Sequence, residues 1–205
     1  MLFGAPVADA RAFEQLPHHL LVLITALPQI GLILYILSLQ PWLYPARYGL
    51  IAFRPIELLR ALGLFLLLLL VPLALTGLLL LLPDAHQLLQ NGFRWRFSRW
   101  EFAPLVVVTS IVVGYREELF FRAYLIGRLE DAGVGRGAAA VGGSILFGLG
   151  HLYQGVPGFV VASLTGLILA IAFLRRRSVH GIALAHGLYN SVVLFAGSLV
   201  AQLPA

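Results

Sequence analysis

Five residues whose side chains can do chemistry lie within apolar stretches of the C-terminal half of the chain: Glu117, Glu118, His151, His186 and Asn190. A carboxylate can take a proton from water as a general base, and an imidazole can help to position that water. Imidazole and carboxamide groups can also donate hydrogen bonds to the oxyanion that develops on a carbonyl under attack. Together these residue types suit hydrolysis of an amide bond by water.

Glu117 and Glu118 are adjacent in a stretch that is otherwise apolar enough to enter a membrane. A carboxylate there costs on the order of 2.5–3.5 kcal/mol, so each one needs a partner or a function. Glu118 and Arg122 are four residues apart, in the favourable acid-then-base order, and we expect an ion pair within the helix. Glu117 lies about 100° round the helix from Glu118, which leaves it available for chemistry.

The other polar residues follow on separate apolar stretches. His151 ends the stretch Phe147-Gly-Leu-Gly-His151, whereas His186 and Asn190 are one helical turn apart and share a face. Each has a structural interpretation: a buried His or Phe147 can simply pack, and Asn can link helices. A set of glycines in the fourth stretch would permit close helix approach: Gly142, Gly143, Gly148 and Gly150. The coincidence of four costly residues in apolar stretches favours a site.

The composition indicates that these stretches lie in a bilayer. The chain has 205 residues, suited to one domain, with 60% hydrophobic and 11% charged residues and a mean hydropathy of +0.92. Soluble domains have about 45–50% and about 25% of these residue classes. The absence of cysteine excludes disulfides and thiolate chemistry. The net charge of +5 comes from scattered arginines, which do not form the basic, aromatic-lined face of a nucleic-acid binder.

A span needs roughly 20 mostly apolar residues, and this length predicts an all-α, polytopic membrane bundle of about six transmembrane helices. The predicted spans are 20–39, 58–82, 102–127, 137–153, 158–174 and 179–203. The fourth and fifth are joined so tightly that a re-entrant segment is an alternative. Acidic residues precede the first span and no basic leader does, so we expect that span to be retained. We predict a single membrane domain over residues 1–205, with a motif-bearing core at 102–203.

The motifs resemble, in order and on separate spans, those of the CPBP family of CAAX prenyl endopeptidases and bacteriocin-processing proteins with an Abi-type membrane domain. The matching residues are Glu117-Glu118-Leu-Phe-Phe-Arg122, Phe147-x-x-x-His151 and His186-x-x-x-Asn190. The resemblance implies an intramembrane glutamic protease on an all-helical fold. It implies Glu117 as the base, His151 as its partner in activating water, and His186 with Asn190 as the oxyanion site. Glu118 and Arg122 take supporting positions, and the first two spans carry no matching motif.

Arginine placement predicts an orientation. One set lies in or beside the first, third and fifth loops: Arg47, Arg54, Arg60, Arg128, Arg136, Arg175, Arg176 and Arg177. The opposite side holds Arg11, Arg94, Arg96 and Arg99. The positive-inside rule places the first set in the cytoplasm and both termini outside. Aromatic residues alternate with arginines before the third span, which predicts a segment anchored in the headgroup zone: Phe93, Trp95, Phe97 and Trp100.

The depth of the polar residues is harder to reconcile. At about 1.5 Å per residue, Glu117 and His186 both come out roughly 10 Å from the cytoplasmic side. His151 comes out nearer 22 Å if its helix starts at Arg136. This difference indicates that a span boundary is misplaced or that a helix is tilted or broken.

Other functions use the same residues. A zinc protease would take His151, His186 and Glu117 as ligands, but the helical His-Glu-x-x-His pattern is absent, so we expect no cofactor. A non-catalytic immunity or binding protein would keep the fold, although the intact motifs argue against it. A proton-coupled transporter would use an intramembrane Glu, but no inverted repeat is evident. We expect the partners to be the lipid bilayer and a protein or peptide substrate, in a bacterial or archaeal inner membrane.

Overall fold

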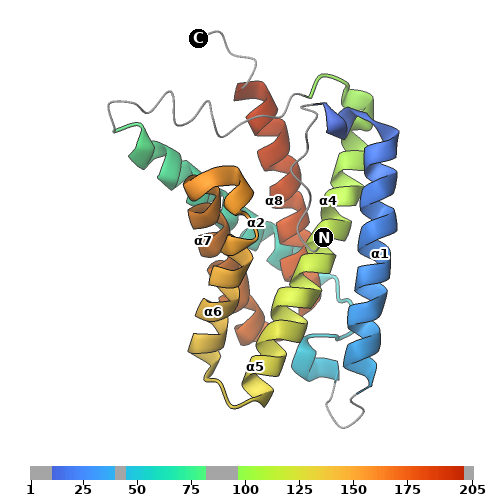
Figure 1. Ribbon diagram of the computed structural model, residues 1–205, viewed down its shortest axis with the longest axis vertical. Coiled ribbons are helices and arrows are strands. Elements are labelled where there is room, and N and C mark those ends of the chain that lie inside the picture. Colours follow the sequence, from blue (N-terminus) through green and yellow to red (C-terminus); the bar gives the residue numbers. More distant parts are fainter. Residues whose placement is uncertain (1–10, 40–44, 82–96, 201–205) are drawn as a thin grey trace.

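The computed structural model describes residues 11–39, 45–81 and 97–200, and this part of the chain folds as helices with no strand. The long helices are α1 (Leu16–Ser38), α2 (Ile56–Leu79), α4 (Ala103–Glu118), α6 (Arg136–Leu149), α7 (Gly155–Arg176) and α8 (Val179–Val200). A π-helical segment, Leu119–Ile126, joins α4 to the short helix α5, Gly127–Asp131. The all-α fold class is confirmed, and each predicted span corresponds to a helical segment (Figure 1).

Four of these helical segments are long and apolar enough to cross a membrane: Leu16–Ser38, Ile56–Leu78, Leu152–Arg176 and Val179–Leu199. The helix α6 has 14 residues and is about 21 Å long, which is shorter than a hydrocarbon core of about 30 Å. The helix that contains Glu117 and Glu118 does not meet the same test of length and composition. The molecule is therefore an integral membrane protein, and about six spans is an approximate count.

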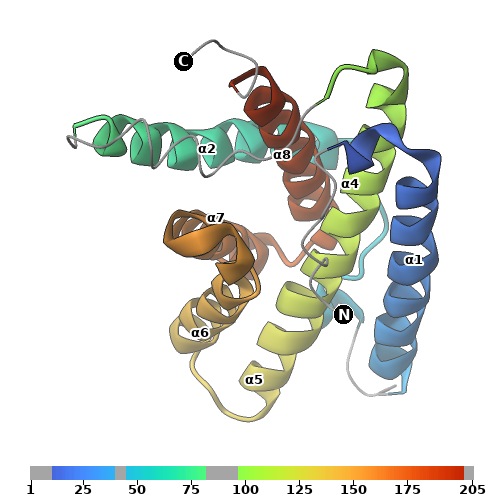
Figure 2. The same ribbon diagram turned by 45° about the horizontal axis from the view of Figure 1, so that its top comes forward.

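A group of three helices, one pair and one crossing helix form the described part of the molecule. α4 packs between α1 and α8, and α6 packs along α7 (Figure 1). α2 lies against α8 and runs across it at a steep angle in the second view (Figure 2). The exposed faces of α1 and α2 consist largely of leucine. Such side chains suit contact with lipid, which replaces water as the solvent of the outer surface.

Small residues set the closest approach between α4 and α8. A Cβ at Gly114 would lie 2.6 Å from the Ala183 carbonyl oxygen, and a Cβ at Gly187 would lie 2.6 Å from the Ile111 Cα. Both contacts are with main-chain atoms, which cannot rotate away. These two glycines precede Glu117 by three residues and follow His186 by one. Main-chain contact of α4 with α8 therefore occurs next to the polar residues.

Two acidic residues at the end of α5 contact residues of the first, third and fifth loops. Asp131 accepts a hydrogen bond of 2.9 Å from the Tyr48 hydroxyl and pairs with Arg47 at 2.5 Å. Glu130 pairs with Arg177 at 2.6 Å and with Arg136 at 3.5 Å. Arginines of the first, third and fifth loops thus lie at one end of the molecule, as the orientation requires. Which side of the membrane this end faces stays a prediction.

At the opposite end, the prediction of a headgroup anchor is wrong for Phe97. Its side chain is 1% exposed and packs against Trp100 and Phe195, and its amide donates to Ser198 Oγ at 2.6 Å. The Phe97 ring reaches the end of α8, where burial against other aromatic rings stabilises the fold. Trp100 is exposed, and residues 93–96 lie outside the described residues.

Candidate active site

The two adjacent carboxylates have different surroundings. Glu118 is fully buried, and its Oε1 accepts from Arg122 Nη1 at 2.8 Å, so the predicted ion pair is confirmed. Glu117 is 8% exposed, and its Oε1 accepts from Arg116 Nη2 at 2.8 Å. The prediction that Glu117 is unpaired is therefore wrong. Neighbouring residues on a helix diverge, but the long Arg116 side chain curls back and reaches the carboxylate.

His186 connects the two carboxylates. Its Nδ1 lies 2.7 Å from Glu118 Oε1, and its Nε2 lies 3.7 Å from Glu117 Oε2. A carboxylate paired with arginine can only accept, so Nδ1 carries a hydrogen and donates it to Glu118. This bond orients the ring and directs Nε2 toward Glu117. The α8 histidine thus joins both acids of α4 across the contact that Gly114 and Gly187 permit.

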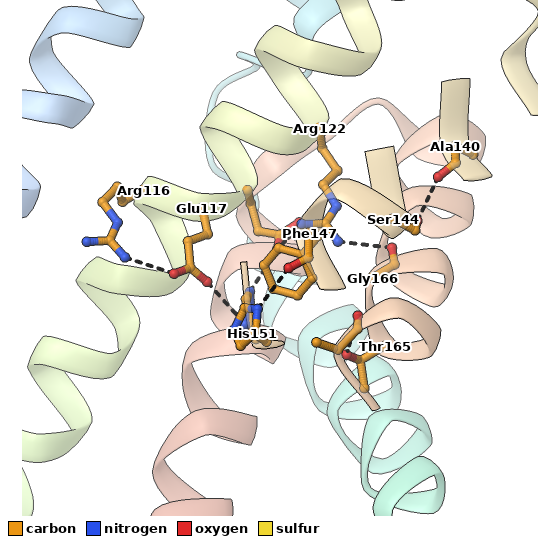
Figure 3. Close-up of polar contacts among 12 residues, drawn as sticks. Arg116, Glu117, Arg122, Ala140, Ser144, Phe147, His151, Thr165 and Gly166 are labelled. Carbon is orange, nitrogen blue, oxygen red and sulfur yellow. Dashed lines mark hydrogen bonds and ion pairs between the residues drawn. The ribbon is translucent and has the colours of Figure 1, made fainter. Parts of the chain in front are cut away.

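Arg122 ties this cluster to α7. Its Nη2 donates to the Gly166 carbonyl oxygen at 2.9 Å, and its guanidinium lies 4.9 Å from the centroid of the Phe147 ring. Gly166 has no side chain at the point where Phe147 and Arg122 pack, and a Cβ there would lie 3.1 Å from the Phe147 ring. Figure 3 shows Arg122 reaching past Phe147 to Gly166. Two arginines balance two carboxylates, so the buried charge is compensated locally.

His151 lies at the end of α6, with its ring centroid 4.6 Å from that of Phe147. The Phe147 ring is in turn 5.6 Å from His186. His151 Nδ1 donates to the Phe147 carbonyl oxygen at 2.9 Å, so Nε2 remains as the acceptor nitrogen. In the close-up, Glu117 points toward the place where His151 lies (Figure 3). The structure therefore brings the first and second motifs together through Phe147.

The difference in depth has a structural explanation. The helix that carries Glu117 continues to Asp131, not to Gly127 as predicted. Glu117 then lies roughly 21 Å from that end, close to the roughly 22 Å between His151 and Arg136. α8 begins part of the way up the molecule, above the turn between α5 and α6 (Figure 1). The predicted boundary and the assumption of a common starting level were both wrong.

Asn190 is partly exposed one turn after His186 on α8. In the described part of the chain, no hydrogen-bond partner takes its carboxamide group. A donor without a partner one helical turn from His186 suits binding of an oxyanion, but the structure brings no other motif residue into contact with it. The role of Asn190 stays a prediction.

Three kinds of residue beside the motifs were missed from the sequence. Arg116 interrupts the apolar stretch one position before Glu117, which is a signal for a partner. Gly114 and Gly187 permit the helix contact, whereas a Cβ at Gly142, where we expected close approach, would meet nothing within 4 Å. Gly148 does pack closely, against Ser163 and Phe159. Tyr153 lies on the His151 ring, and no sequence pattern pointed to it.

The same residues were considered as zinc ligands. Among the residues that the structure describes, no group of three or more His, Asp or Glu side chains is arranged to hold a metal ion. His186 Nδ1 and His151 Nδ1 both donate to oxygen atoms, which leaves only one nitrogen on each ring for any other bond. Whether the protein binds zinc is a question for elemental analysis.

Comparison with known proteins supports the resemblance. Residues 99–192 match the family model described as Rce1-like, type II CAAX prenyl endopeptidase. No curated protein and no solved structure gave a match. The matched residues include all three motifs and the helices that hold them. The chain is therefore a helical membrane protein whose residues 99–192 match the Rce1-like model of the CPBP family, a match that supports a membrane endopeptidase.

Proposed function

We propose that this protein is an intramembrane glutamic endopeptidase that hydrolyses a peptide bond of a membrane-associated or exported protein. The observation that carries the proposal is the buried cluster in which His186 joins Glu117 and Glu118. Charged groups at membrane depth are costly and usually functional. A cluster that served packing alone would be replaced by apolar side chains at little cost in stability.

The site supports a direct mechanism. Glu117 takes a proton from a water molecule that His151 helps to position, and the oxygen attacks the scissile carbonyl carbon. The carbonyl oxygen becomes an oxyanion, which Asn190 and the Nε2–H of a protonated His186 stabilise by hydrogen bonds. Glu117 then gives its proton to the leaving nitrogen as the C–N bond breaks. The products are a carboxylic acid and an amine, and no metal is needed in this scheme.

The surroundings favour Glu117 over Glu118 as the base. Glu118 Oε1 accepts both from Arg122 and from His186, and the side chain is fully enclosed. Its Oε2 has no partner among the described residues but is equally inaccessible. Glu117 keeps slight exposure, and its Oε2 is held only by the longer, 3.7 Å contact with His186. A base must reach water and substrate, so the slight exposure of Glu117 supports its assignment over the enclosed Glu118.

We further propose that residues 102–203 form the core of one membrane domain spanning 1–205, in the inner membrane of a bacterium or archaeon. Secreted peptides, membrane-anchored proteins and C-terminal sorting signals are the substrate classes that such a location makes accessible.

Glu117→Gln tests the proposal. Cells that produce this variant should accumulate uncleaved membrane-protein precursors, because cleavage falls by on the order of 10²–10⁴ when a general base is lost. Precursors are identified by quantitative proteomics of membranes, with wild type for comparison. The substitution conserves side-chain volume but removes the negative charge beside the buried Arg116. The melting temperature in detergent should therefore fall, whereas the variant should still accumulate as folded protein.

Glu101→Gln is the matched control, because Glu101 is an exposed acid whose ion-pair partner among the described residues is Arg99. It should leave the precursor pattern unchanged. Substantial cleavage by Glu117→Gln together with inactive Glu118→Gln would reverse the assignment within the pair. Cleavage by both variants would reject the glutamic mechanism.

A further inference from the structure

Tyr153 lies in the 3₁₀ turn Leu152–Gln154, between α6 and α7 and two residues after His151. The turn is held by a hydrogen bond of 2.9 Å from the main-chain N–H of Gln154 to the His151 carbonyl oxygen. It ends at Gly155, whose φ of 79° favours glycine. The main chain therefore fixes the position of Tyr153 relative to His151.

The ring of Tyr153 lies over that of His151, with centroids 6.1 Å apart and an interplanar angle of 27°. Phe147 packs on His151 at a centroid distance of 4.6 Å. Phe147 is 2% exposed, but Tyr153 is 49% exposed. Tyr153 is thus an accessible aromatic side chain in direct contact with a motif residue.

The Tyr153 hydroxyl has an unused hydrogen. Its oxygen accepts from Gln154 Nε2 at 2.9 Å, so that amide occupies an acceptor position and leaves the O–H free to donate. No group in the described part of the chain accepts this hydrogen. The hydroxyl also lies within electrostatic range of Glu117 and Arg116. The Tyr153 hydroxyl is therefore a partly exposed donor beside His151 of the candidate site.

We propose that Tyr153 binds substrate, donating its O–H hydrogen to a main-chain carbonyl beside the scissile bond while its ring contacts the adjacent side chain. This inference rests on the proposed endopeptidase function. An aromatic side chain that only anchored the protein in the headgroup zone would need neither contact with His151 nor a glutamine to orient its hydroxyl. A peptide that bound beside His151 would meet the exposed Tyr153 side chain.

Site-specific photo-crosslinking tests the contact. Tyr153→p-benzoylphenylalanine is made in the Glu117→Gln background, which keeps the substrate uncleaved. Val156→p-benzoylphenylalanine is the control, because Val156 is 71% exposed, lies three residues further along the chain and belongs to none of the motifs. The position 153 probe should crosslink to the same precursor that accumulates with Glu117→Gln, at several times the yield of position 156. Equal or no crosslinking at position 153, while that precursor accumulates, would overturn the proposal.

Cleavage kinetics with the purified precursor in detergent separate the contribution of the Tyr153 hydroxyl to substrate binding from that of its ring. Tyr153→Phe should lower kcat/KM about 3–10-fold, the effect of one lost hydrogen bond, mainly by raising KM. Gln154→Ala should act in the same direction in wild type and have no effect in Tyr153→Phe. An unchanged kcat/KM in Tyr153→Phe, or a loss matched by a lower melting temperature, would refute the contact. If no precursor accumulates with Glu117→Gln, the endopeptidase function fails first and this inference fails with it.

Discussion

Glu117 and Glu118 differ by one position, and that difference decides what each can do. The helix turns them by about 100°, so Glu118 faces Arg122 and His186 whereas Glu117 faces Arg116 and keeps 8% exposure. His186 Nδ1 holds one acid, and Nε2 of the same ring faces the other. Glu118 is therefore held by two short contacts, whereas one oxygen of Glu117 has only a longer contact with His186 among the described residues.

Asn190 provides a test that separates glutamic from metal catalysis. As an oxyanion donor, it would lower the barrier in the transition state, so Asn190→Ala should reduce kcat by on the order of 10²–10³ with little change in KM. Purified protein should retain its activity after dialysis against a chelator. The measurements are cleavage kinetics and elemental analysis. One equivalent of zinc, with activity lost on chelation and restored by zinc alone, would exclude the glutamic mechanism.

Some site contacts were predictable and others were not. The Glu118–Arg122 pair follows from i, i+4 spacing within one helix. Contacts between helices, such as His186 with both acids, depend on rotation and tilt, which a single sequence does not specify. Arg116 with Glu117 was missed because side chains at adjacent positions normally point apart. The sequence pointed to the motif residues, but their contacts across helices could be assigned only from the packing of α4 against α8.

At the scale of elements, the glycine contact between α4 and α8 positions the site. Gly114→Ala places a Cβ 2.6 Å from the Ala183 carbonyl oxygen and 2.9 Å from the Gly187 amide nitrogen. The helices must separate, so His186 should move away from Glu117. We expect cleavage to fall at least tenfold (about 1.4 kcal/mol in barrier), together with a lower melting temperature in detergent.

Gly63→Ala is the matched control, because a Cβ at Gly63 in α2 meets nothing within 4 Å. Alanine is favoured over glycine within a helix, so this variant should be at least as stable as wild type and fully active. Wild-type cleavage by Gly114→Ala would show that the close contact is not required for catalysis.

The sequence predicted which segments form helices, but it did not predict where those helices end. The apolar runs predicted every long helix, because about 20 apolar residues have few other solutions. The helix of Glu117 nevertheless extends through Asp131, since the polar residues Arg128, Glu130 and Asp131 form ion pairs there. A span predicted from hydropathy stops where the first charged residues appear, although the helix itself continues through them.

At the scale of the molecule, the arginine-rich end defines an orientation. A reporter fused after Arg177 should be cytoplasmic, and one fused at Ala205 should be external, because the larger set of arginines stays inside. Reporter enzymes active on only one side of the membrane measure this. A cytoplasmic reporter at Ala205 would contradict the orientation or the number of spans.

The opposite end has a contact that depends on pH. The Glu14 carboxylate accepts from the amides of Ser98 and Arg99 and from the Ser98 hydroxyl. Burial acts to raise the pKa of Glu14, but these donors outweigh it and hold the pKa below its usual value. A carboxyl with a lowered folded-state pKa stabilises the fold above its unfolded pKa of about 4.3. That contribution is lost as pH falls through the folded value.

Glu14→Gln should therefore melt below wild type at pH 7, and the difference in melting temperature should shrink between about pH 5 and pH 3. Thermal melting in detergent across this range is the measurement. A difference that stays constant with pH would show that the carboxylate charge does not contribute.

The short sequence separation of the Glu118–Arg122 pair has a consequence for biogenesis. During synthesis, α4 reaches the membrane before α7 and α8 exist, so neither Gly166 nor His186 can yet receive these side chains. An acid and a base one turn apart on the same helix neutralise each other without any later segment. Glu118 and Arg122, whose charges are costly to insert into a bilayer, can thus enter it as an ion pair. The candidate site assembles only once α8 arrives, so the proposed protease would stay inactive until the last helix has entered the membrane.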